Sequence, residues 1–179
     1  MTFLLMSRHL RTCCALALAV AAPLACSDDD RISDVMPSAP AVLGPDAMSA
    51  FITVSDPKPG VGDRVTVTVR AIRGASVGRI GSFTLSLAYG AKQLRFIEAG
   101  RSAYGMVLAN GAERGMVKAA GASAEGFADD QLITAVFEVA APNAMETLQL
   151  TVSEMNSVAF HDQRAQMRVE RALYRENRR

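Results

Sequence analysis

Apolar and polar residues alternate along several short stretches of this chain, most clearly over residues 64–71. One face of that stretch would carry Val65, Val67, Val69 and Ala71, with arginine or threonine between them. Successive side chains of a β-strand point to opposite faces, so this period of two predicts a strand with one buried face. Residues 83–89 repeat the pattern, with Phe83, Leu85, Leu87 and Tyr89 on the apolar side. Such a chain is expected to fold as sheets that share an apolar interior.

Further strand-like runs are separated by clusters of Gly, Pro, Asn or Asp. These runs are residues 48–54, 94–97, 106–109, 116–120, 132–139 and 148–152. The turn-forming residues 90–93 predict that the strands at 83–89 and 94–97 form a hairpin. Seven or more short strands with scarcely a helical period predict an all-β fold, an antiparallel β-sandwich with one core over residues 47–174.

The C-terminal region carries two conflicting patterns. Arginines recur at helical spacing at positions 164, 168, 171 and 175, whereas Met167 and Val169 alternate as in a strand. We favour a final strand from Met167 to about Leu173, followed by a basic tail at residues 175–179.

The N-terminus has the form of a bacterial lipoprotein signal. Arg8 and Arg11 provide a positive region, residues 13–24 form an apolar region, and small Ala25 precedes Cys26. We therefore expect residues 1–25 to be a signal peptide and Cys26 to carry the lipid. Pro23 stands where this pattern favours leucine, and ordinary cleavage after Ala21 or Ala22 is the alternative.

The expected lipid would tether the protein without a membrane span, because a dozen apolar residues are too few to cross a bilayer. Residues 26–46 are rich in Asp, Pro, Ala and Ser, which predicts a flexible, disordered linker. Ser27 after the cysteine resembles the outer-membrane sorting pattern of lipoproteins in diderm bacteria. We expect an exported protein of the cell envelope, at the outer membrane.

Charge and ligand chemistry exclude several function classes. Residues 26–179 hold 17 basic and 18 acidic residues, a formal charge of −1 that argues against nucleic-acid binding. His161 is the only histidine and Cys26 the only cysteine there, so the usual zinc sites of nitrogen and sulfur ligands cannot form. We predict no metal and no cofactor.

One motif suggests catalysis. Residues 74–78 match Gly-x-Ser-x-Gly around Ser76, and Asp129 or Asp130 and then His161 follow in hydrolase order. That motif needs a strand entering and a helix leaving at the serine, whereas here both flanks have strand patterns. We predict a turn and no enzyme, with a serine hydrolase using Ser76 as a remote alternative.

Five pieces of the chain resemble the cohesin domain and its relatives among bacterial cellulose-binding and adhesion modules. They are residues 52–55, 60–63, 83–89 with 94–96, Gly100, and 132–139. Cohesins commonly place Asp-Pro after the tyrosine of the third piece, whereas this chain has Gly90-Ala91. The resemblance implies a nine-stranded jelly-roll sandwich that binds through one sheet face, either to a dockerin helix pair or to polysaccharide.

Candidate contact residues follow from these strands. Thr84, Ser86 and Ala88 form the outward side of the strand at 83–89, a small and flat row, and Tyr104 lies in a glycine-bounded loop where it could anchor an interface. Tryptophan is absent, which disfavours an aromatic platform for sugars. We therefore expect protein binding or surface assembly with a dockerin-like or other envelope protein, and a carbohydrate-binding accessory module is the alternative.

Overall fold

The computed structural model describes residues 39–40, 43–100, 105–127 and 130–176. The chain divides into two units, residues 1–34 and 35–179, and every described residue lies in the second. The strands are β1 (Met48–Val54), β2 (Arg64–Arg73), β3 (Ile80–Ala88), β4 (Leu94–Gly100), β5 (Met106–Asn110), β6 (Met116–Ala122), β7 (Gln131–Val139), β8 (Gln149–Ser157) and β9 (Met167–Arg175). Two short 3₁₀ helices, η1 (Ala144–Thr147) and η2 (Arg164–Gln166), precede β8 and β9. The expected signal peptide and Cys26 lie outside the described residues.

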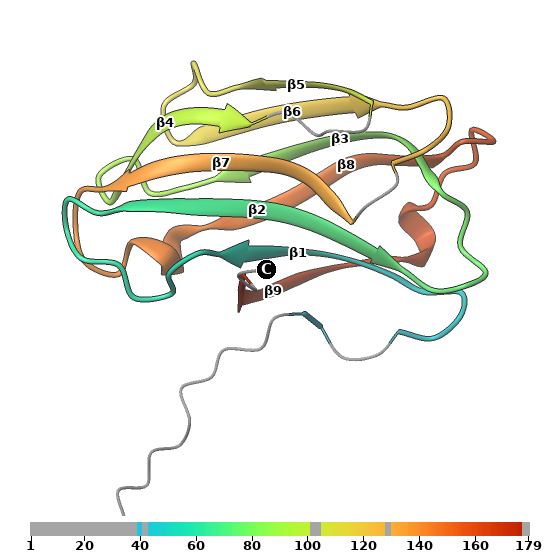
Figure 1. Ribbon diagram of the computed structural model, residues 1–179, viewed down its shortest axis with the longest axis horizontal. Helices are drawn as coiled ribbons and strands as arrows, with labels where there is room; N and C mark the ends of the chain where they lie inside the picture. The colour runs from blue at the N-terminus through green and yellow to red at the C-terminus, as the bar shows by residue number, and fades with distance from the viewer. Residues whose placement is uncertain (1–38, 41–42, 101–104, 128–129, 177–179) are drawn as a thin grey trace, which may run out of the picture. The chain divides into compact units, whose positions relative to one another are not determined.

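The nine strands of the described region form two sheets that pack as a sandwich (Figure 1). One sheet has the order β4-β7-β2-β1-β9 and the other the order β5-β6-β3-β8. The all-β sandwich with about nine strands is confirmed. It departs from a purely antiparallel fold at one place, because β1 pairs with β9 in parallel.

The core lies between the sheets, where the apolar positions of the alternating strands meet. Val67 of β2 and Phe137 of β7 enter it from the five-stranded sheet, and Leu87 of β3 and Val117 of β6 enter it from the four-stranded sheet. All four residues are fully buried. Burial of this apolar surface is the main force that holds the two sheets together.

Strand β1 is buried on both faces, which alternation alone does not predict. Its outward Phe51 is covered by the ring of Tyr174 on β9, with ring centroids 5.2 Å apart and an edge-on geometry. Beside it, the Ser49 hydroxyl donates to Glu170 Oε1 at 3.2 Å. Side chains of the neighbouring strand β9 therefore cover these outward residues of β1.

The predicted hairpin between residues 83–89 and 94–97 is wrong. Strand β3 pairs with β6 and β8, whereas β4 pairs with β7 in the opposite sheet. The amides of Gln93 and Leu94 both donate to the Gly90 carbonyl at 2.9 Å, and this turn takes the chain from one sheet to the other. Alternation identifies the buried face of a strand but not its neighbours, so a crossover buries the same residues as a hairpin would.

The final strand is confirmed over the helical alternative. Strand β9 runs from Met167 to Arg175, two residues beyond the predicted end, and pairs with β1. Tyr174 is buried, whereas Arg168, Arg171 and Arg175 are exposed. The helical spacing of the arginines therefore reflects solvent-facing positions of an edge strand.

Candidate binding face

We call the surface of the four-stranded sheet that points away from the core the outer face. On β3, Phe83, Leu85 and Leu87 are buried in the core, and the residues between them lie on the outer face. The predicted residues Thr84, Ser86 and Ala88 are therefore brought together in one half-buried row. Tyr104, the fourth predicted contact residue, lies outside the described residues.

The strand register aligns small side chains across the middle of the outer face. One cross-strand row, read from β5 through β6 and β3 to β8, consists of Leu108, Ala120, Thr84 and Glu154. The adjacent row consists of Met106, Ala122, Ser82 and Asn156. Because the central positions of both rows are Ala, Ser or Thr, the middle of the outer face is flat enough for close approach by a partner backbone.

The β5 side of the outer face exposes two large apolar side chains. Met106 is 68% exposed and Leu108 is 69% exposed, whereas Val107 between them is buried. Sequence reasoning placed a strand here but missed these two residues, because three consecutive apolar residues do not indicate which face is buried. Exposed apolar residues on an edge strand favour association, so this pair marks the outer face as a contact surface.

The β8 side of the same face is polar and held by hydrogen bonds. Glu154 accepts from the Thr84 hydroxyl at 3.0 Å through Oε2, and from Asn156 Nδ2 at 2.8 Å through Oε1. Asn156 Nδ2 also lies 3.2 Å from Ser82 Oγ. This network fixes a carboxylate at the opposite edge of the sheet from Met106 and Leu108, an arrangement suited to an amphipathic partner.

Phe160 is a further exposed apolar residue that sequence reasoning missed. It lies in the loop that follows β8, is 89% exposed, and has a left-handed φ of 61°. A residue with a Cβ costs about 1–2 kcal/mol in this conformation. The ring gains little burial within the described structure to offset that cost, which makes it a candidate contact residue.

The residues of the possible hydrolase triad are not linked in the described structure as a catalytic triad requires. Ser76 is exposed in the turn between β2 and β3, so its flanks are strands, as the sequence indicated, and not the strand and helix of a nucleophile elbow. Asp130 forms an ion pair with Arg70 at 2.8 Å, and exposed His161 belongs to the loop after β8. Asp129 lies outside the described residues. Nothing in the described residues joins Ser76 to His161 or Asp130 by a hydrogen bond.

Neither a metal-binding cluster nor a membrane-spanning helix occurs among the described residues. Within these ranges, His, Cys, Asp and Glu side chains do not gather in groups of three that could hold a metal ion. In the same part of the chain, no helix has the length and apolar character needed to cross a membrane.

Comparison with known proteins identifies the fold. No family model and no curated protein matches this chain. A non-cellulosomal cohesin from Archaeoglobus fulgidus is similar in structure, with 18% identity, a TM-score of 0.51, and coverage of 70% of this chain and 86% of that one. The sixth cohesin of scaffoldin B from Acetivibrio cellulolyticus, solved in complex with a Cel5 dockerin mutant, has 14% identity, a TM-score of 0.53, and coverage of 73% and 98%.

A cohesin module from a Clostridium perfringens family 33 glycoside hydrolase is also similar, with 15% identity, a TM-score of 0.52, and coverage of 65% and 87%. At these identities the likeness shows the fold alone. The described part of the chain is a cohesin-like β-sandwich, as the resemblance in sequence implies.

Proposed function

We propose that this protein is a non-catalytic, lipid-anchored binding module of the cell envelope that holds a protein partner on its outer face. The observation that carries the proposal is the pairing of exposed Met106 and Leu108 with a flat row of small residues and an ordered polar edge. The partner is a dockerin-like or other envelope protein. The solved Acetivibrio cellulolyticus cohesin in complex with a dockerin supports a protein partner for this fold.

A protein is a better fit to the outer face than a sugar. Full burial of a leucine or methionine side chain contributes about 1.5–3 kcal/mol, and Met106 and Leu108 are both mostly exposed. Aromatic rings would be the expected platform for a sugar. The described residues of β5, β6, β3 and β8 on this face are aliphatic, small or polar.

Replacing Leu108 with glutamate is expected to weaken partner binding about 30-fold, the factor that corresponds to an interface residue worth about 2 kcal/mol. The carboxylate would have to lose its hydration on an apolar surface. Immobilised full chain is exposed to an envelope extract of the producing organism, and the crosslinked partner is quantified. A glycan array is run in parallel with the same protein.

Val61→Glu is the matched control, because Val61 is 64% exposed but lies in the loop between β1 and β2. It should bind like the unchanged protein. Equal capture by the Leu108 and Val61 variants would refute the outer-face assignment. Glycan binding without protein capture would instead identify a carbohydrate-binding accessory module.

Replacing Cys26 with serine is expected to release the protein from membranes. The Cys26 thiol is the lipid acceptor in the proposed lipoprotein pathway, and serine lacks that thiol. Because stable attachment needs more than one acyl chain, a protein without the lipidated cysteine should leave the membrane. Metabolic labelling with an alkyne-bearing fatty acid, followed by separation of membrane and soluble fractions, measures both properties. Retention of label and membrane association in the Cys26→Ser variant would contradict the anchor but leave the outer-face proposal intact.

A further inference from the structure

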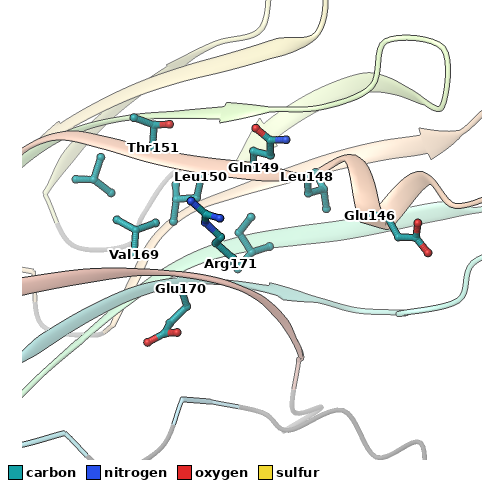
Figure 2. A pocket seen from close by; sticks show the side chains of 10 residues that line it. Glu146, Leu148, Gln149, Leu150, Thr151, Val169, Glu170 and Arg171 are labelled. Carbon is teal, nitrogen blue, oxygen red and sulfur yellow. The ribbon is translucent and has the colours of Figure 1, made fainter.

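A groove of about 770 Å³ separates strands β8 and β9 on one side of the sandwich (Figure 2). Its walls include apolar side chains from both strands, among them Leu150, Val152 and Val169. All three are half-buried, and Leu150 and Val152 pack against the core, so the core reaches the surface here. The groove lies at the edges of both sheets, on the opposite side of the four-stranded sheet from Met106 and Leu108 on β5. It meets the outer face at its β8 margin, where Gln149 and Thr151 also line it.

Each wall of the groove is an edge strand. Among the described strands, β8 pairs only with β3 and β9 pairs only with β1, so both have one side without a neighbouring strand. Alternate residues of such an edge direct their N–H and C=O groups away from the sheet. An edge of this kind can bind an additional strand.

The chain itself covers one half of the β8 edge. Asp162 forms an antiparallel bridge with Asn156, the Gln163 amide donates to the Met155 carbonyl at 2.8 Å, and the Arg164 guanidinium donates to the Ser153 carbonyl at 3.0 Å. Hydrogen bonds from Arg164 to the Asp162 carboxylate also lower the pKa of Asp162 to about 2. This short segment, residues 161–164, therefore makes strand-like hydrogen bonds to the C-terminal half of the edge.

The other half of the β8 edge, residues 149–152, is not covered in this way. No loop segment in the described part of the chain donates a hydrogen bond to these four residues or accepts one from them. Leu150 and Val152 line the groove there. The free edge therefore begins where the chain's own added segment ends.

A positive charge is directed into the groove. Figure 2 shows the Arg171 side chain extending from β9 toward Leu150 on β8, whereas Glu170 points to the opposite side of β9. Glu170 is held there by Ser49 and Arg168. Arg171 is exposed and has no carboxylate partner among the described residues.

We propose that the groove binds an extended peptide segment of a partner, which adds to the 149–152 edge of β8 as an antiparallel strand. Apolar side chains at alternate positions of the peptide pack on Leu150, Val152 and Val169. A carboxylate of the peptide pairs with Arg171. This site is distinct from the Met106 and Leu108 side of the outer face and adds a second mode of protein recognition to the sandwich.

The probe is the capped peptide acetyl-Val-Thr-Glu-Thr-Val-Thr-amide, whose valines and glutamate share one face of an extended strand. It is titrated into the isotope-labelled full chain while backbone amide NMR signals are recorded. Signals of residues 149–152 and 169–171 are expected to shift. A peptide with lysine in place of glutamate should bind about fivefold more weakly, because exposed charge pairs contribute up to about 1 kcal/mol. A peptide with N-methylated amides on its pairing edge should not bind.

Arg171→Glu should reverse the preference in favour of the lysine peptide, whereas Arg175→Glu, at an exposed position of the same strand outside the groove lining, should preserve it. Leu108→Glu should leave peptide binding unchanged, which separates this test from that of the outer face. Three results would overturn the proposal: no shifts at about 1 mM peptide, equal binding of the two charged peptides, or concentration-dependent shifts at 149–152 without peptide. The last would identify a second copy of the chain as the occupant.

Discussion

Replacing Phe137 with alanine is expected to lower the free energy of unfolding by about 3–5 kcal/mol, a large part of the stability of a domain of this size. Phe137 is fully buried, and its ring contacts Tyr89 at 5.0 Å and Phe96 at 5.8 Å between centroids. Alanine would leave a cavity where three aromatic rings now meet. Chemical denaturation measures the loss, and the melting temperature should fall by roughly 10–20 °C.

Phe96→Ala is the control for that experiment. Phe96 touches the same ring but is only half-buried at the margin of the core, so less transfer free energy is lost when it is truncated. We expect about half the destabilisation seen for Phe137→Ala. If both variants lost equal stability, the core would not be centred where the two sheets meet at Phe137.

Replacing Gly121 with valine is expected to destabilise the protein by about 3 kcal/mol. Gly121 lies on the buried side of β6, and a Cβ at this position would stand 2.5 Å from Phe83 Cε1 and 3.1 Å from Phe127 Cζ. Both phenylalanine rings are buried and pack against each other at 5.2 Å between centroids, so neither can move away cheaply. Thermal unfolding followed by circular dichroism measures the change.

Gly100→Val is the matched substitution at a strand glycine with free space. A Cβ there would have its nearest contact at 3.5 Å, on Thr134, which is an ordinary van der Waals distance. Because valine favours strands and glycine costs conformational entropy, this variant should be neutral or more stable. Equal destabilisation at both positions would show that loss of a strand glycine, and not the close Phe83 ring, determines the cost.

Strand positions could be predicted from the sequence because they depend on local information. Val65 to Ala71 on β2 and Phe83 to Leu87 on β3 alternate in sequence, and their apolar residues are buried in the structure. The pairing of strands is not local information. The hairpin prediction failed at Gly90, because a turn into the opposite sheet buries the same side chains as a hairpin.

The candidate site was only partly accessible from the sequence for a similar reason. Thr84, Ser86 and Ala88 could be assigned to an outward row, but their neighbours Leu108 and Ala120 become visible only through the cross-strand register. The groove depends on two strands far apart in sequence, β1 and β9, pairing in parallel so that β9 lies across from β8. No periodicity in the chain encodes that arrangement.

Site-specific photocrosslinking in the producing cells tests the central claim most directly. A photoreactive phenylalanine analogue is placed at position 108 on the outer face, or at position 61 in the loop before β2, two positions of similar exposure. We predict a discrete crosslinked protein from position 108 and none from position 61. Crosslinks of equal yield at both positions, or only at position 61, would contradict the assignment of the outer face as the surface that binds the partner.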